Sequence, residues 1–280
     1  AAATHAAAMS DATASLIESR NLRPSPHRRD ARDNPSTHDS PSRNLRDARI
    51  SRSTPIMTHE YYHAVSSAPG RTGETFLGGA RLYKGLQALT AGANIRLFDL
   101  GQPGQGIVHV IGPELGIVQP GLTVICGDSH TCTNGALGAI AFGVGSSELT
   151  HALATQTLML RKPKKMRITF EGTLGSGVTA KDMALHMVGH LGASAGTGYA
   201  IEYAGSAVEA LDVEQRMTLC NLSIELGARI GLVAPDAKTF AYLRGRQFAP
   251  DDAHIEQAIA YWRTLPTDAS AFFDREEFID

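Results

Sequence analysis

The stretch from Gly121 to Glu148 constrains the fold more than any other part of this sequence. It opens with a short apolar run, Leu122 to Cys126, which is typical of a buried strand. The polar turn Asp128 to His130 follows this run, and small residues and glycines come after it. Ser146 to Glu148 then predict the start of a helix, because a hydroxyl can cap the helix and an acid stands in its first turn. The stretch therefore predicts a strand, a turn and a helix in series.

The turn after this strand is a candidate ligand site. Open α/β sheets bind ligands at the carboxyl ends of their strands, where the chain turns toward a helix. Asp128, Ser129 and His130 stand together there, and their side chains can accept, donate and shuttle protons at one place. A chance cluster in a polar turn is the alternative, and the spacing alone does not exclude it.

The composition is that of an α/β protein without a polyanionic partner. Of the 280 residues, 42% are hydrophobic and 19% are charged, and this length allows one or two domains. The formal net charge is −2, and basic residues are concentrated only in the N-terminal segment, which argues against nucleic-acid binding. No apolar run approaches the roughly 20 residues that span a bilayer, so we expect no membrane segment.

The three cysteines, Cys126, Cys132 and Cys220, argue against a secreted, disulfide-bonded protein. A sparse and odd set of cysteines is typical of a reducing compartment, and we expect a cytoplasmic protein. The spacing matches no zinc or iron–sulphur signature within the chain. We therefore interpret each cysteine as a small buried hydrophobic residue.

The chain divides by composition into three parts. Residues 1–57 are rich in Ala, Ser, Arg, Asp, Pro and His and poor in large apolar residues, so we expect a disordered segment. A first, partial α/β domain is expected at residues 58–163, and a second at residues 164–280 with a truncated C-terminal end. Because the chain begins with Ala and stops without an obvious terminal element, we expect it to be a piece of a longer protein.

Strand and helix patterns alternate along the second and third parts. Met166, Ile168 and Phe170 alternate with polar residues as in a half-buried strand, and Thr179 with Asp182 forms a capping box. This alternation predicts an α/β fold in layers, with mostly parallel sheets. The expected elements are a helix ending near Gly92, a strand at 95–100, a helix from Ser146 to Pro163, a strand beginning at Lys164, a helix between Thr179 and Gly192, a strand at 199–203, a helix at 214–229 and helical segments after Pro235.

Two further polar residues stand in apolar surroundings. His109 interrupts the apolar run Ile107 to Ile111, where a lone histidine is usually a hydrogen-bonded core residue. Glu225 stands between Ile224 and Leu226, so it can lie on the solvent face of its helix. Each residue alone is a weak sign of a functional site.

Several long motifs in series resemble the aconitase family, and such a series is far more specific than any one pattern. The resemblance covers roughly residues 95–274. It implies a set of aconitase-like α/β domains around an iron–sulphur cluster, in agreement with the alternating pattern above. The motifs, in chain order, are GQGIVHVIGPELG (104–116), GDSHTCTNGALGAIAFGVGSSE (127–148), HALATQT (151–157), GVTAKDM (177–183), GTGYAIEYAG (196–205) and RMTLCNLSIELGAR (216–229).

The resemblance implies a hydro-lyase that isomerises a hydroxy-diacid by removing and re-adding water. The motifs are most similar to the branch that converts 2-isopropylmalate to 3-isopropylmalate in leucine biosynthesis. In this family a [4Fe–4S] cluster with one iron open to the substrate acts as the Lewis acid that helps hydroxide leave. A separate small subunit usually supplies the base that removes the carbon-bound proton. We therefore expect a small-subunit partner and a small-molecule hydroxy-diacid substrate.

The resemblance also implies catalytic roles for individual residues. Asp128 and His130 match positions that approach the open iron and its bound water or hydroxyl. His109 and Glu225 match a histidine–carboxylate pair, and a carboxylate beside an imidazole favours the protonated form, which suits proton donation to a leaving oxygen. The matched pocket residues near the substrate and the cluster are Ser129 and Asn221.

The sequence departs from the family pattern in ways that bear on activity. The three cysteines that bind the cluster in relatives would lie beyond Asp280, and no cysteine of this chain stands in such a position. We therefore expect no cluster in this chain and no activity from it alone. The family's Asp–His pair upstream of His109 has only His59 or His63 as a counterpart, and neither follows an Asp.

Two other functions remain open from the sequence. His59 to His63 fits the H-E-x-x-H pattern of zinc metalloproteases, but Pro55 and Pro69 bracket the stretch and no third-ligand continuation follows. The other alternative is a truncated, non-catalytic subunit that folds and only binds a partner.

Overall fold

The computed structural model describes residues 62–64, 79–93 and 95–280. The disorder predicted for residues 1–57 falls outside these ranges, and so does His59.

The first described elements form a small parallel strand pair with a helix between its strands in the chain. Strand β1 (Tyr62–Ala64) pairs with β2 (Arg96–Phe98), and α2 (Gly79–Gly92) precedes β2. The predicted helix end near Gly92 and the strand after it are confirmed.

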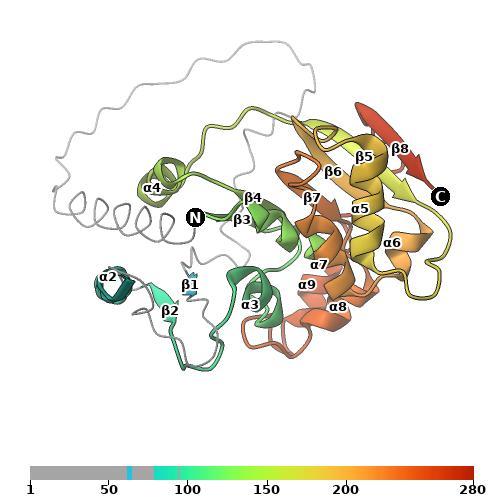
Figure 1. The fold of residues 1–280 in the computed structure, drawn as a ribbon. Helices are drawn as coiled ribbons and strands as arrows, with labels where there is room; N and C mark the ends of the chain where they lie inside the picture. Colours follow the sequence, from blue (N-terminus) through green and yellow to red (C-terminus); the bar gives the residue numbers. More distant parts are fainter. Residues whose placement is uncertain (1–61, 65–78, 94) are drawn as a thin grey trace, which may run out of the picture.

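A four-stranded parallel sheet is the centre of the C-terminal half (Figure 1). Its strands lie in the order β7, β6, β5, β8. Because neighbouring strands run parallel, each connection must cross from one end of the sheet to the other, and helices make most of these crossings. The strands are β5 (Lys164–Phe170), β6 (Tyr199–Ala204), β7 (Ile230–Val233) and β8 (Arg275–Ile279). The helices are α5 (Ala180–Leu191), α6 (Ser206–Ala210), α7 (Val213–Asn221), α8 (Ala237–Leu243) and α9 (Ile255–Trp262).

The sequence pattern explains how β5 and α5 form. Met166, Ile168 and Phe170 of β5 are buried as predicted, while the residues between them are less so. Helix α5 begins with the predicted capping box, in which the Thr179 hydroxyl accepts from the backbone N–H of Asp182 and the Asp182 carboxylate accepts from that of Thr179. The local signals at this strand and this helix were therefore sufficient.

A second parallel pair carries the polar turn that the sequence singled out. Strand β3 (Thr123–Cys126) pairs with β4 (Ile140–Gly143), and the 3-10 helix η3 (Ser129–Leu137) connects them. The prediction that β3 is buried is wrong: Thr123 is exposed and the next three residues are half-buried. The strand lies outside the four-stranded sheet and, in the described part of the chain, pairs only with β4.

Two predicted helix boundaries also need correction, and one strand was missed. Helix α4 (Ser146–Thr155) ends well before Pro163, because Gln156 adopts the left-handed conformation, with φ of 59°. Helix α7 ends at Asn221 and turns follow as far as Gly227, so the helix predicted at 214–229 is too long. Strand β8 was not predicted at all, and it occupies an edge of the sheet (Figure 1).

One hydrophobic core connects η3 with the four-stranded sheet. Its buried residues run from Val118 and Leu137 to Ile279. Helix η3 packs on α7 and β7 so closely that a Cβ at Gly135 would lie 1.7 Å from the carbonyl oxygen of Gly231. The described residues therefore form an α/β fold with parallel sheets, as predicted, and the domain boundary placed at residue 163 stays a prediction.

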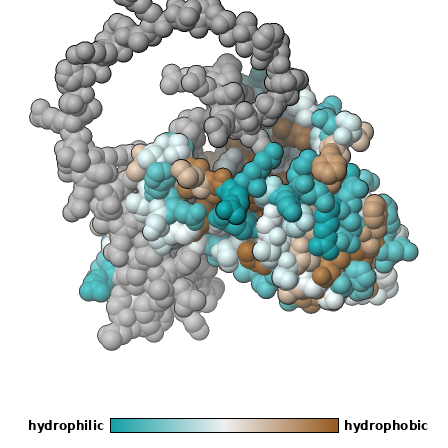
Figure 2. Space-filling view, turned by 90° about the horizontal axis from the view of Figure 1, so that it is seen from above, coloured by the Kyte–Doolittle hydropathy of each residue, from teal (hydrophilic) through white to brown (hydrophobic). Residues whose placement is uncertain are grey.

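The surface mixes polar and apolar residues. Figure 2 shows hydrophobic and hydrophilic regions interspersed over the described part of the face in view. Large exposed apolar side chains belong to several separate elements, including Ile140 of β4, Leu185 of α5 and Phe278 of β8. Within the described ranges, every helix falls short of the length and apolar character that a bilayer crossing requires.

Candidate active site

The candidate site is built on the turn between β3 and η3. Asp128 caps η3, since its Oδ1 accepts a 2.7 Å hydrogen bond from the backbone N–H of His130. The end of β4 lies against this turn, because a Cβ at Gly143 would come within 2.6 Å of the carbonyl oxygen of Asp128. The polar turn therefore lies at the carboxyl ends of both strands of this parallel pair, where the sequence predicted a ligand site.

Four predicted catalytic side chains form a continuous series of contacts. The Nε2 atom of His109 lies 3.2 Å from Oδ1 of Asp128, and this oxygen lies 3.6 Å from Nδ1 of His130. The Nε2 atom of His130 lies 3.5 Å from Oε1 of Glu225. We call His109, Asp128, His130 and Glu225 the histidine–carboxylate series. Because imidazoles and carboxylates alternate in it, neighbouring groups can exchange protons.

The histidine–carboxylate series leads from the interior to the surface. The side chain of His109 is 6% exposed, whereas those of His130 and Glu225 are 38% and 56% exposed. A ligand in solvent would therefore meet His130 and Glu225 directly, and His109 only through Asp128.

His109 lies on the helix α3 (Val108–Glu114) in surroundings that disfavour its charged form. Burial lowers the pKa of the imidazole, and the hydrogen bond and charge of Asp128 only partly oppose this effect. On the other side of the ring, Nδ1 lies 3.4 Å from Nδ2 of the buried Asn134. The neutral imidazole is therefore the form that the fold favours.

Asp128 is held in its ionised form. Burial raises the pKa of its carboxyl, but the backbone N–H of His130 and the imidazole of His109 outweigh burial and bring the pKa below the usual value. The carboxylate therefore carries a fixed negative charge between the two histidines.

The structure corrects the histidine–carboxylate pairing that the family resemblance implied. His109 contacts Asp128, and it is His130 that contacts Glu225. Burial also lowers the pKa of His109, so the fold does not favour the protonated form that the resemblance implied. The reason is its position on α3, which places the ring in the core behind Asp128 rather than at the surface beside Glu225.

The two predicted pocket residues join the same site from opposite sides. The Oγ atom of Ser129 lies 3.2 Å from Nδ1 of His130. Asn221, at the end of α7, donates from Nδ2 to the hydroxyl of Thr133 at 2.9 Å, and Thr133 in turn donates to the backbone oxygen of His130. Thr133 thus ties α7 to the polar turn.

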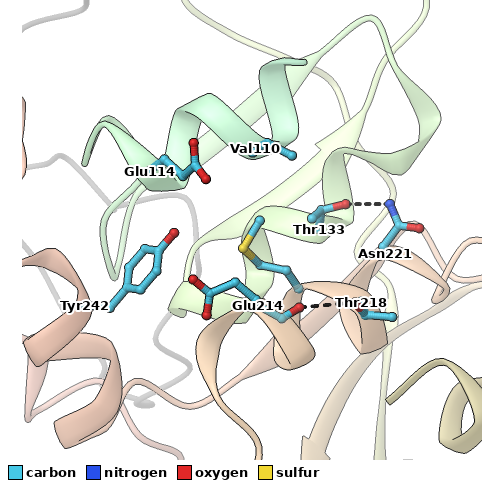
Figure 3. A pocket seen from close by; sticks show the side chains of 8 residues that line it. Val110, Glu114, Thr133, Glu214, Thr218, Asn221 and Tyr242 are labelled. Atoms are coloured by element: carbon cyan, nitrogen blue, oxygen red, sulfur yellow. Dashed lines mark hydrogen bonds between the residues drawn. The ribbon is translucent and has the colours of Figure 1, made fainter. Parts of the chain in front are cut away.

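A cavity of about 280 Å³ lies beside this link (Figure 3). Thr133 and Asn221 line it together with two carboxylates, those of Glu114 and Glu214, and with the phenol of Tyr242. Two acidic side chains disfavour a dianionic ligand in this cavity. The residues of the histidine–carboxylate series do not line this cavity, and because the series also contains two carboxylates, a diacid would need a cation beside it.

The three cysteines do not fit the role of cluster ligands. Iron–sulphur clusters bind thiolates, but burial raises the pKa of Cys132 to about 11 and the pKa of Cys220 well above its usual value. Burial also raises the pKa of Cys126. In the described ranges, moreover, no three His, Cys, Asp or Glu side chains are grouped to hold a metal ion. No chemical step is therefore assigned to a cluster bound by these thiols.

Two residues of the site were not found from the sequence. Asn134 is 2% exposed and contacts His109, and only its polar side chain within the small-residue stretch could have pointed to it. Arg229 donates from Nη2 to the carbonyl oxygen of Gly143 at 2.7 Å, which places a cation next to the turn. It was placed at the end of the helix predicted at 214–229, whereas α7 ends at Asn221, so this contact could not be foreseen.

The doubtful upstream histidines are only partly described. His59 lies outside the described residues, and the backbone of His63 pairs with Leu97 in the β1–β2 pair. A role for either residue stays a prediction, as does the zinc-protease alternative.

Comparison with known proteins supports the resemblance on which these roles rest. The aconitase family (aconitate hydratase) model matches residues 40–280. The chain is also 59% identical, over 218 residues, to the 3-isopropylmalate dehydratase large subunit 1 of Bradyrhizobium diazoefficiens. That alignment covers 78% of this chain and 46% of the relative, so the chain spans about half the length of the relative it matches. On these matches, the chain belongs to the aconitase family.

Proposed function

We propose that this chain forms part of the catalytic surface of a hydro-lyase that isomerises 2-isopropylmalate to 3-isopropylmalate, a step of leucine biosynthesis. The observation that carries the proposal is the histidine–carboxylate series at the carboxyl ends of β3 and β4. The similarity to a 3-isopropylmalate dehydratase large subunit supports the choice of substrate.

The reaction needs a proton at the oxygen that leaves and a proton acceptor for the return step. Removing water from the hydroxy-diacid breaks one C–O and one C–H bond and forms a C=C bond, and adding water at the neighbouring carbon reverses these changes. His130 is the member of the series that suits proton transfer to and from this oxygen, because its ring is exposed and lies between the carboxylates of Asp128 and Glu225. His109 holds Asp128 from the interior and does not contact the substrate.

A dianionic substrate also requires positive charge, which the series itself does not offer. Arg229 lies beside the turn through its bond to the oxygen of Gly143, and a guanidinium can bind a carboxylate in a bidentate manner. We therefore assign Arg229 to one carboxylate of the substrate.

Further components would come from outside this chain. Aconitase-family proteins typically carry a [4Fe–4S] cluster, and the thiols of this chain do not fit it. The relative is named as a large subunit, which supports a small-subunit partner. We therefore propose that the chain alone is inactive.

A chimaeric enzyme tests this function directly. Residues 95–274 of this chain would replace the corresponding residues of the Bradyrhizobium large subunit, expressed with its own small subunit, and conversion of 2-isopropylmalate would be measured. We expect turnover in the chimaera and a loss of about 10²- to 10⁴-fold on His130→Ala, the usual contribution of a general acid–base. Arg229→Gln should mainly raise KM.

The matched control is His151→Ala, which removes an exposed histidine of α4 that belongs to no part of the series. It should retain the turnover of the chimaera. A folded chimaera without any turnover would contradict the proposal and would favour a non-catalytic, partner-binding subunit.

A further inference from the structure

We infer that Asn134 is a positioning residue that fixes the tautomer of His109, with the ring proton on Nε2, the nitrogen that lies 3.2 Å from Oδ1 of Asp128. The importance of this tautomer for catalysis rests on the function proposed above, but the tautomer itself does not.

The orientation of the Asn134 amide follows from its neighbours. The side chain is 2% exposed, and its Nδ2 lies 3.0 Å from the backbone oxygen of Thr131 and 3.4 Å from Nδ1 of His109. A carbonyl oxygen can only accept, so the amide must present its NH₂ group to Thr131. The reverse orientation would place two oxygen atoms against each other in a buried site.

The same NH₂ group has a second hydrogen, and it faces the imidazole. A nitrogen that accepts this hydrogen bond must carry a lone pair, so Nδ1 of His109 is unprotonated. In a neutral imidazole the single proton is then on Nε2, because the hydrogen bond at one ring nitrogen decides which nitrogen is protonated. Burial lowers the pKa of this imidazole, so the neutral form is the relevant one.

The tautomer of His109 affects how the carboxylate of Asp128 is held. Its Oδ1 lies 3.2 Å from the Nε2 atom of His109 and accepts from the backbone N–H of His130 at 2.7 Å. Both contacts converge on Oδ1, so the carboxylate is held from the interior and from its own turn. The Asp128 side chain is 46% exposed, so a ligand can still reach the carboxylate. Asn134 thus acts on the substrate only through His109 and Asp128.

The amide oxygen of Asn134 makes no hydrogen bond to a described residue, so the contacts of the NH₂ group determine how the amide is oriented. The Oδ1 atom of Asn134 is buried and has no hydrogen-bond partner in the described structure. A Cβ placed at Gly112 would be 3.6 Å from this oxygen, so the oxygen lies beside α3. An unpaired buried acceptor is unfavourable, and the two contacts of the NH₂ group must therefore outweigh it.

Nitrogen NMR of the purified chain, labelled with ¹⁵N-histidine, tests the inference without substrate or cofactor. Spectra at about pH 8, above the ordinary pKa of histidine, show which ring nitrogen of His109 carries the proton. The His109 signals are assigned by their loss in His109→Gln. In the unsubstituted chain we expect a protonated Nε2 and an unprotonated Nδ1.

Two substitutions should change this pattern in different ways. Asn134→Leu removes the donor and should give a mixture of both tautomers. Asn134→Asp replaces the donor with an acceptor and puts a carboxylate beside the ring, so Nδ1 should become protonated. If Asn134→Leu does not fold, Asn134→Asp and the unsubstituted chain still decide the question.

The matched control is Gln119→Met. Gln119 is another buried amide, 5% exposed, that donates to the backbone oxygens of Gly116 and Phe248 at 2.9 Å and does not contact His109. This control should keep the proton on Nε2. A proton on Nδ1 in the unsubstituted chain, an unchanged pattern in both Asn134 variants, or the same change in Gln119→Met would each overturn the inference. A protonated Nε2 together with an inactive chimaera would instead reject only the proposed function.

Discussion

Burial determines which role the imidazole of His109 is suited to. Its ring lies against Asp128 on one side and Asn134 on the other, so both nitrogens have polar neighbours. A protonated imidazole would add a charge in an environment that offers little solvation, and this cost exceeds the attraction of the carboxylate. At this position a histidine is therefore suited to holding a neighbour rather than to releasing a proton.

The pH dependence of stability should report this burial. The pKa of His109 is lowered from 6.5 in the folded chain, so below that pH the unfolded chain binds a proton that the folded chain resists. The free energy of unfolding should then fall as the pH decreases from about 7 to about 5, by up to about 1.4 kcal/mol per pH unit. His109→Gln removes the titrating group and should flatten the dependence, as measured by urea denaturation at a series of pH values.

The buried amide Gln119 again supplies a control for the pH experiment. Gln119→Met removes a buried polar group without removing a titrating one, so it should keep the pH dependence of the unsubstituted chain. Equal slopes for His109→Gln and the unsubstituted chain would show that His109 is not the group responsible.

The sequence predicted which residues belong to the site, but it did not predict which of them contact one another. Asp128, Ser129 and His130 are adjacent in the chain, so their proximity needed no fold to be predicted. The choice between Asp128 and Glu225 as the partner of His109 depends on where α3 packs, and α3 lies in an apolar run without any distinctive signal. For the same reason the contact of Asn134 could not be predicted.

At the level of elements, the sequence predicted helix ends that are set by local capping residues. It did not predict ends and strands that depend on packing against distant parts of the chain. Helix α5 begins at the capping box of Thr179 and ends at Gly192, both of which are visible in the sequence. Helix α7 continues in pattern beyond Asn221, yet the turns after it pack on another loop, where a Cβ at Gly227 would lie 2.6 Å from the hydroxyl of Thr197. Strand β8 was missed because charged residues and the exposed Phe278 obscure its alternation.

Two glycines should respond in opposite ways to the same added methyl group. A Cβ at Gly135 would lie 1.7 Å from a backbone oxygen of β7, which no side-chain movement can relieve. Gly135→Ala should therefore lower the free energy of unfolding by about 1–3 kcal/mol or more. Gly189 lies within α5 with nothing within 4 Å of the added Cβ, so Gly189→Ala should raise it by about 0.5–1 kcal/mol.

Urea denaturation followed by circular dichroism measures both glycine variants, and Gly189→Ala serves as the control for Gly135→Ala. A neutral Gly135→Ala variant would mean that η3 does not approach β7 as closely as described.

At the scale of the molecule, one core ties the site to the sheet. The buried cluster extends from Val118 to Ile279 and includes Leu137 of η3, whereas α2 and β2 contribute no residue to it. The polar turn is thus attached to the most extensively packed part of the described chain. Few long-range contacts of that kind could be read from a sequence, although the α/β class could.

Hydrogen exchange should distinguish the common core from α2 and β2. Backbone amides of β5, β6 and η3 belong to the common core and should exchange together, through global unfolding. Amides of α2 and β2 should exchange sooner, because neither element contributes a residue to that core. Mass spectrometry of peptides after deuterium labelling at increasing urea concentration measures the difference, and equal protection of α2 and β5 would contradict it.

The strand order β7, β6, β5, β8 has a consequence for the nascent polypeptide on the ribosome. Strands β5, β6 and β7 emerge in the order in which they pair, so they can associate as synthesis proceeds. The partner of the remaining edge of β5 is β8, which begins only at Arg275 and is translated after the other three strands of the sheet. Until that segment emerges from the ribosome, one edge of β5 is unpaired and is exposed to chaperones or to other nascent chains.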